Sequence, residues 1–164
     1  MTDRIRRMYS EAQNRLHDAE LLGSSLGIRS DSQAIIRILA FEVLLKSALL
    51  ITNQEPKSTH NYKNLWRALP GHARKEILAV ASQQMPGHAD LSNIDKLLLG
   101  YQFIFERARY HYELYDDYSL TEQHELGQYW LEIGAPIEEA VVRYYPLELE
   151  CLIAGMNAYI EKAL

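Results

Sequence analysis

The sequence has very little cysteine, since Cys151 is the only one among 164 residues. An internal disulfide is therefore excluded, and with it the class of small secreted proteins that disulfides hold together. The sequence also lacks a charged-then-apolar leader and any uncharged apolar run long enough to cross a membrane. We therefore expect a cytoplasmic protein without a membrane segment.

Catalytic and metal-binding signatures are scarce too. No glycine-rich phosphate loop is present, and His124-Glu125 lacks the second histidine that a zinc-protease helix carries. No glutamate is followed by a histidine three residues later, as a di-iron bundle would require. The sequence therefore predicts no metal and no cofactor. We interpret the scattered histidines as solvated or structural residues, namely His17, His60, His72, His88 and His124.

Acidic and basic residues are mixed along the sequence, which carries a formal charge of −5. A dedicated duplex-binding protein would show a basic stripe, so this class is disfavoured, although a local basic groove stays open. A chain of 164 residues suits one domain, which would bury about 70 % of the surface that the unfolded chain exposes. We expect a single domain over residues 1–164.

Strand-like alternation is absent, whereas apolar residues recur at helical spacing through most of the sequence. The predicted fold is all-α, an up-and-down helical bundle of four to five main helices with short accessory helices. We expect a first helix before Gly23, a second from Ser30 or Asp31 to Leu49, and two short helices on either side of Leu69-Pro70-Gly71. A long helix is expected over residues 94–115 and a shorter one over residues 121–133, before the break at Gly134-Ala135-Pro136. The last helix is expected after Pro146.

The segment from Phe105 to Glu113 is the one place where acids, bases, a histidine and aromatics crowd together. On a single helix over residues 94–115, Arg107 and His111 would share a face, with their Cβ atoms about 6 Å apart. Apolar residues would cover two other faces, so we expect a sandwiched helix with partly desolvated charges. The core stripe would comprise Ile94, Leu97, Leu98, Tyr101, Ile104, Phe105, Ala108 and Tyr112. The second apolar line, which predicts a homodimer, comprises Leu99, Phe103, Tyr110 and Leu114.

A second polar group interrupts the nearly all-apolar helix before residue 50. Glu42 and Lys46 lie four residues apart in the orientation that favours an ion pair. Since a lone buried charge is costly, one interpretation is a buried pair completed by Arg109 or Glu106. The other interpretation is a polar cluster that lines a pocket.

The sequence from His60 to Trp66 is typical of a helix start. Ser58 and Thr59 have the composition of a helix cap, and we expect His60 to cap this helix or to pack beside it. Leu65 and Trp66 are then expected to enter the core.

Four groups of residues recur in an order that is similar to a known family. They are Phe41-Glu42-x-x-Leu45-Lys46, then His60 with Leu65, Trp66 and Leu69-Pro70, then Phe105-x-x-x-Arg109-Tyr110-x-Tyr112-Glu113, and Tyr145-Pro146-Leu147-Glu148. Over residues 1–164 this order resembles the HEPN superfamily of small helical-bundle domains. The resemblance implies a bundle of four or five helices that dimerises, in a toxin–antitoxin, phage-defence or CRISPR-associated setting. It also implies RNA or a nucleotide as the ligand.

The resemblance further implies a metal-independent ribonuclease motif, an arginine followed after four to six residues by a histidine, which two protomers pool across the dimer. Arg107 and His111 have only three residues between them, so this sequence departs from that pattern. Arg67 and His72 have the family's spacing, but Pro70 interrupts them and we regard this match as accidental.

Arg107 and His111 are the candidate catalytic residues. A histidine can exchange protons with the ribose 2′-hydroxyl and the leaving oxygen, while an arginine holds the phosphate charge. The compressed spacing equally allows a non-catalytic homodimeric interaction module. Candidate partner proteins are an antitoxin or a nucleotidyltransferase, and no membrane is expected. The remaining candidate site residues, for binding or for a structural ion network, are Glu42, Lys46, Glu106, Arg109, Tyr110 and Glu113.

Overall fold

A computed structural model describes residues 2–25 and 31–164. Within these ranges the chain is all-helical and contains no strand, which confirms the predicted fold class. None of the helices in this part of the chain is long and apolar enough to cross a membrane. The α-helices are α1 (Thr2–Ser25), α2 (Asp31–Ile51), α3 (Tyr62–Ala68), α4 (Gly71–Ala81), α5 (Ile94–Glu106), α6 (Leu120–Glu132) and α7 (Pro146–Glu161), and the 3₁₀ helices are η1 (Ala108–Tyr115) and η2 (Ile137–Glu139).

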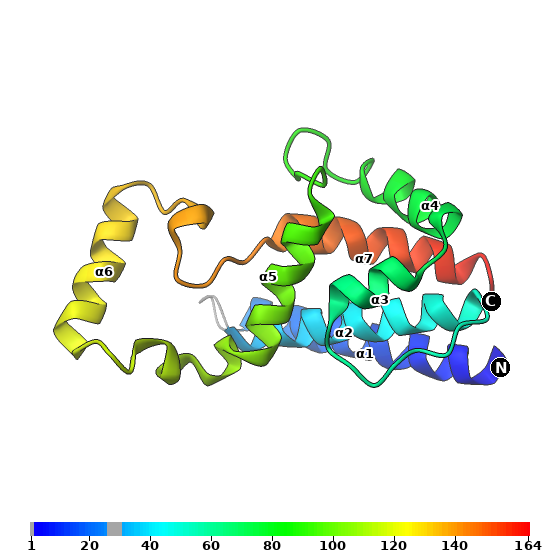
Figure 1. The fold of residues 1–164 in the computed structure, drawn as a ribbon, viewed down its shortest axis with the longest axis horizontal. Coiled ribbons are helices and arrows are strands. Elements are labelled where there is room, and N and C mark those ends of the chain that lie inside the picture. Colours follow the sequence, from blue (N-terminus) through cyan, green and yellow to red (C-terminus); the bar gives the residue numbers. More distant parts are fainter. Residues whose placement is uncertain (1, 26–30) are drawn as a thin grey trace.

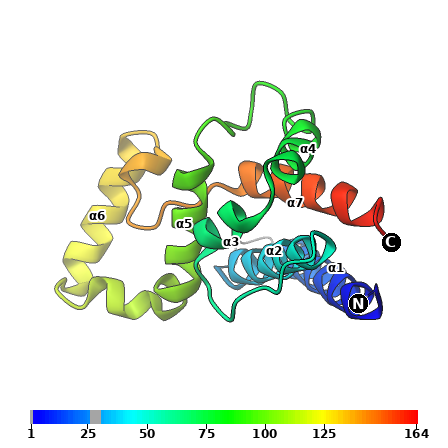
Figure 2. The same cartoon turned by 45° about the vertical axis from the view of Figure 1, so that its right-hand side comes forward.

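Helix α2 occupies the middle of a bundle formed by α1, α2, α3, α4, α5 and α7 (Figures 1 and 2). It packs antiparallel along α1 and also contacts α3, α5 and α7, so apolar residues are buried around most of its circumference. The ring of Phe41 on α2 meets the edges of Tyr62 from α3 and Tyr101 from α5, at centroid distances of 6.3 Å and 6.2 Å. These three aromatic residues join α2, α3 and α5 into one core.

Helix α7 closes the bundle by packing against α2 and α4. A Cβ atom on Gly155 would overlap the carbonyl oxygen of Ile77 in α4, so glycine is required for this close approach. Cys151, on the same helix, is fully buried, and burial raises the pKa of its thiol. Both residues therefore serve packing within the chain.

Most of the predicted helix boundaries agree with the structure. The two short helices are separated at Leu69 and Pro70, and the last helix begins at Pro146. Leu65 and Trp66 are buried, as expected. Ser30, one of the two caps considered for the second helix, lies outside the described residues, and the helix begins at Asp31.

The single helix expected over residues 94–115 is wrong. Helix α5 ends at Glu106, and the chain continues as the 3₁₀ helix η1, in which Tyr110 has the non-helical dihedral angles φ −108° and ψ 57°. Ala108 is the last buried residue of the segment 94–115, and Tyr112, which was expected in the core, is 70 % exposed. Because a helix depends on tertiary packing of its apolar face, α5 ends where the bundle no longer covers it.

The expected partial desolvation of the charges in this segment is also wrong, since these side chains are exposed. The exposed residues are Glu106, Arg107, Arg109, His111 and Glu113. The predicted second apolar line is broken as well, because Leu99 and Phe103 lie on α5 whereas Tyr110 and Leu114 belong to η1.

Residues 107–144, which we call the arm, leave the bundle and return to it before α7 (Figure 1). Helix α6, predicted over residues 121–133, has no buried residue. It begins with a capping box in which Ser119 and Glu122 exchange hydrogen bonds. It ends at a turn where Gly134 has a φ of 90° and the Trp130 indole donates to the carbonyl oxygen of Pro136 at 2.8 Å. Local hydrogen bonds therefore define the arm.

Candidate functional site

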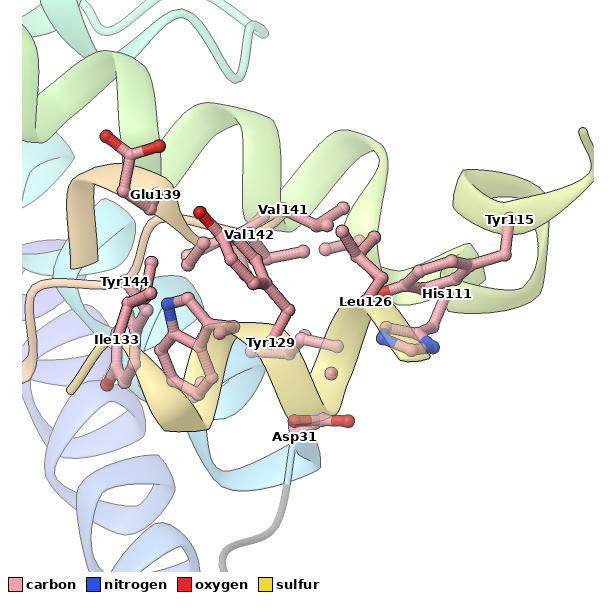
Figure 3. Close-up of a pocket in the computed structure, with 17 residues that line it drawn as sticks. Asp31, His111, Tyr115, Leu126, Tyr129, Ile133, Glu139, Val141, Val142 and Tyr144 are labelled. Atoms are coloured by element: carbon pink, nitrogen blue, oxygen red, sulfur yellow. The ribbon is translucent and has the colours of Figure 1, made fainter. Parts of the chain in front are cut away.

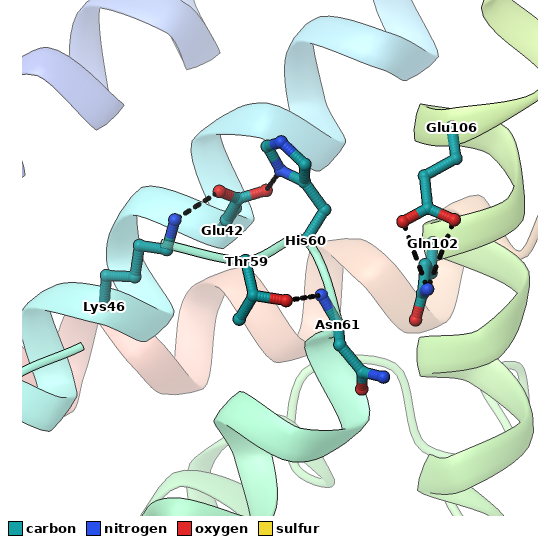
Figure 4. Close-up of polar contacts among 7 residues, drawn as sticks. All are labelled: Glu42, Lys46, Thr59, His60, Asn61, Gln102 and Glu106. Atoms are coloured by element: carbon teal, nitrogen blue, oxygen red, sulfur yellow. Dashed lines mark hydrogen bonds and ion pairs between the residues drawn. The ribbon is translucent and has the colours of Figure 1, made fainter. Parts of the chain in front are cut away.

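The carboxylate of Glu42 is the centre of a polar cluster beside α2 (Figure 4). Only 3 % of Glu42 is exposed, and its carboxylate forms hydrogen bonds with two side chains. Lys46 donates to Oε1 at 2.7 Å, and Nδ1 of His60 lies 2.9 Å from Oε2. Glu42 is therefore buried and Lys46 half-buried, which agrees with the interpretation as a buried or half-buried pair, but the third member is His60 rather than Arg109 or Glu106.

The loop before α3 determines the position of His60. The hydroxyl of Thr59 accepts a hydrogen bond from the backbone N–H of Asn61, and the side chain of Asn61 caps α3 by accepting from the N–H of Asn64. Asn61 is thus the cap, and His60 packs beside the helix. The His60 ring lies 4.6 Å from the ring of Phe105 on α5 while its side chain stays 50 % exposed.

The hydrogen bonds of Glu42 determine the tautomer of His60. An ionised carboxylate can only accept, so Nδ1 of His60 carries the hydrogen in the bond to Oε2. In the neutral ring Nε2 then keeps its lone pair, and within the described ranges this nitrogen has no hydrogen-bond partner. An oriented imidazole with a free Nε2 has the geometry of a general base.

The guanidinium of Arg109 contacts Phe105, the aromatic residue on which His60 packs. The Cζ atom of Arg109 lies 5.3 Å from the centre of the Phe105 ring and 5.0 Å from that of Tyr110. Phe105 therefore contacts both His60 and Arg109. Since Arg109 is exposed, its donors are accessible to an anionic ligand.

Tyr62 lies beneath this cluster and is influenced by three of its charges. Its hydroxyl is buried without a hydrogen-bond partner of normal geometry, although Glu42 lies close enough to act on it. Burial, followed by the negative charges of Glu42 and Glu106, raises the pKa of Tyr62 far above its usual range, while Arg109 lowers it slightly. Glu106 is itself held by two hydrogen bonds of 3.2 Å from Gln102.

The structure thus brings four of the predicted site residues, Glu42, Lys46, Glu106 and Arg109, into the cluster around Glu42, Tyr62 and Phe105. The other four are placed differently. Arg107 is the C-cap residue that follows α5, and His111 lies in η1 with its ring 5.1 Å from that of Tyr115. The break in the helix removes the common face that the sequence predicted for these two residues. Tyr110 contacts Arg109, and Glu113 accepts a hydrogen bond from Tyr112.

The sequence analysis interpreted His60 as a solvated or structural residue and did not predict its contact with Glu42. Glu42 and His60 are 18 residues apart and belong to different elements, so no local spacing joins them. One signal was available. A carboxylate in a helix that is otherwise buried requires donors, and His60 stands in the first loop that follows that helix.

Within the described ranges, no group of three or more His, Cys, Asp or Glu side chains is arranged to hold a metal ion. Comparison of the chain with protein-family models, with curated proteins and with solved structures found no match. The residues of the cluster themselves are thus the basis for a functional hypothesis.

Proposed function

We propose that this protein is a cytoplasmic, HEPN-like protein that binds RNA and cleaves it without a metal. The observation that carries the proposal is the His60 imidazole, held by the buried carboxylate of Glu42 with Nε2 free, and the guanidinium of Arg109, which contacts the same Phe105 ring. This arrangement supplies a proton acceptor and a phosphate-binding cation, which are the groups that RNA cleavage by the 2′-hydroxyl requires.

In the proposed reaction, Nε2 of His60 takes the proton of the ribose 2′-hydroxyl. The 2′-oxygen forms a bond to phosphorus, and the bond from phosphorus to the 5′-oxygen of the next nucleotide breaks. The products are a 2′,3′-cyclic phosphate and a 5′-hydroxyl that receives a proton. Arg109 stabilises the charge that develops on the phosphoryl oxygens, and the exposed Tyr110 offers a ring on which an unpaired base can stack. Glu42 and Lys46 act as positioning residues.

Arg107 and His111 remain the second candidate pair for the same chemistry. Both are exposed and both lie within five residues of Phe105 or Arg109 in the chain. His111 is a candidate donor of the proton to the leaving oxygen. Separate substitutions of the two histidines distinguish the two assignments.

Cleavage of a fluorescent single-stranded RNA in the presence of EDTA tests this proposal. We expect His60→Ala to lower the rate by about two to four orders of magnitude, and a substrate with 2′-deoxyribose to resist cleavage. The matched control is His88→Ala, which removes an exposed histidine from the loop after α4 and should leave the rate unchanged. A rate that falls in His111→Ala but not in His60→Ala would assign the proton transfer to the arm instead.

A non-catalytic homodimeric interaction module is the second candidate function. It is favoured by Leu99 and Phe103, which are exposed together on one side of α5. Sedimentation of the wild-type protein at micromolar concentration should report a dimer, and the double variant Leu99→Asp, Phe103→Asp should report a monomer. Wild-type protein that is dimeric but leaves RNA intact and unbound would favour this module over the ribonuclease.

A further inference from the structure

The negative charge of the chain is concentrated in the arm. Of 22 acidic and 17 basic residues in the whole sequence, residues 107–144 contain eight acidic and three basic ones. The formal charge of the arm is therefore −5, which equals the charge of the entire chain and leaves the rest balanced. All eight acidic residues lie between Glu113 and Glu139, so this part of the arm repels an RNA phosphate backbone and attracts a basic ligand.

A groove of about 400 Å³ separates the arm from the bundle (Figure 3). One wall comes from α2 and α5, and the other from α6, η1 and the segment that follows η2. Most of its lining is apolar or aromatic and includes Ile35, Ile104, Leu126, Trp130, Ile133 and Val142. A groove with this lining suits apolar side chains of a ligand.

Two carboxylates lie at the edges of this groove. Asp31, the first residue of α2, and Glu139, the last residue of η2, both line it and are exposed. Neither forms an ion pair with any residue that the structure describes. Among the described lining residues, His111 is the only one with a basic side chain. The lining thus combines two carboxylates and one histidine with a mostly apolar surface.

We propose that this groove binds an amphipathic helix with basic flanks from a partner protein. The apolar face of the helix fills the groove, and lysine or arginine side chains at its ends meet Asp31 and Glu139. A partner helix of about 14 residues, roughly 21 Å long, would lie beside α6, of which Leu126, Gly127, Tyr129 and Trp130 line the groove. This binding differs from the proposed RNA cleavage at His60 in its ligand, which carries the opposite charge, and the groove shares only the second candidate histidine, His111, with that proposal.

Fluorescence anisotropy with two synthetic helices tests the proposal. The probe is a labelled amphipathic peptide of about 14 leucine and lysine residues, and its control has the same pattern with glutamate in place of lysine. The full-length protein should bind the lysine peptide at least about tenfold more tightly, with an affinity that falls as salt is added. No binding at a protein concentration on the order of 100 μM would overturn the proposal.

Matched variants locate the binding surface. The double variant Asp31→Lys, Glu139→Lys should weaken binding of the lysine peptide about tenfold. The control Glu125→Lys, Glu132→Lys changes the net charge equally at exposed positions of α6 that do not line the groove, and should change binding less than about twofold. Leu126→Asp should likewise weaken binding more than Leu131→Asp, since only Leu126 lines the groove.

Four outcomes would contradict this proposal. One is equal binding of the lysine and glutamate peptides, and another is an equal effect of the two double variants. A single-stranded RNA that displaces the lysine peptide would assign the groove to nucleic acid. Loss of a wild-type dimer in Leu126→Asp, with Leu131→Asp still dimeric, would assign the groove to a second copy of this chain. Circular dichroism and a thermal transition like that of the wild type establish that each variant is folded.

Discussion

Helix α5 of the bundle and helix α6 of the arm each have 13 residues, but the two regions are stabilised in different ways. In the bundle, side chains such as Phe41, Leu98 and Leu152 are fully buried, so packing against neighbouring helices holds each element. In the arm, α6 buries no residue and depends on the capping box at Ser119 and on the hydrogen bond of Trp130. Stability therefore resides in the bundle, while the arm presents its apolar side chains to the solvent and to the groove.

The largest expected effect comes from the aromatic core of the bundle. Phe41→Ala removes a ring that is fully buried between Tyr62 and Tyr101, and should lower the free energy of unfolding by about 3–5 kcal/mol. The matched change in the arm is Leu120→Ala, where the side chain is 86 % exposed, and its effect should stay within about 0.5 kcal/mol. Urea unfolding followed by circular dichroism measures both. Equal losses would show that the arm shares the bundle's core.

The next effect concerns the buried carboxylate. Lys46→Ala leaves Glu42 with His60 as its only partner and should cost about 3 kcal/mol in urea unfolding. Replacing Glu42 and Lys46 together by leucine should recover much of this loss, because no buried charge then lacks a partner. Lys162→Ala is the control, since its pair with Glu76 lies on the surface and should contribute little. A Lys46→Ala variant as stable as this control would refute a desolvated pair.

A smaller effect is expected at the start of α6. Ser119→Ala removes the side chain that accepts from the N–H of Glu122, and should cost about 1 kcal/mol of local stability. Hydrogen exchange should detect the loss in the amides of α6 and leave those of α2 unchanged. Faster hydrogen exchange in the amides of the whole molecule would mean that the two regions unfold together.

The smallest effect is a dependence of the arm on pH. Hydrogen bonds from Ser119 lower the pKa of Glu122 below its ordinary value of about 4.5. Glu122 therefore stabilises α6 above the unfolded-state pKa, and this contribution disappears as the pH falls through the lower folded-state pKa. Protection factors of α6 amides should decrease over that acidic range in the wild type and stay nearly constant in Glu122→Gln, which has no titrating carboxylate. The same acid dependence in both proteins would exclude Glu122 as its source.

The two regions also explain which features the sequence predicted. Ile5, Ala12 and Ala19 recur every seven residues on α1 and are all buried, because the spacing that predicts a helix results from its packing. The same spacing continues past Glu106 to Ala108 and Tyr112, although no bundle surface covers Tyr112. A sequence pattern shows where the apolar side chains are. Whether another element covers them depends on the fold.

The residues of the candidate site also divide into those that the sequence predicted and those that it did not. The ion pair of Glu42 and Lys46 was predictable because both residues lie on one helix, four positions apart. The contact of His60 with Glu42 depends on how the loop before α3 crosses α2, which no local spacing encodes. Arg107 and His111 were predicted to share a face only because a continuous helix was assumed. Local pairs are thus predictable, and pairs that join separate elements require the structure.

Native-state hydrogen exchange of the wild type and of Phe41→Ala is the most direct test of this division between bundle and arm. We predict that the most protected amides of α2 and α7 exchange only through global unfolding, and that Phe41→Ala lowers their protection by the full loss of stability. Amides of α6 should exchange through local opening, with protection that is lower in the wild type and unchanged in the variant. Amides of α6 as protected as those of α2, and equally sensitive to Phe41→Ala, would contradict it.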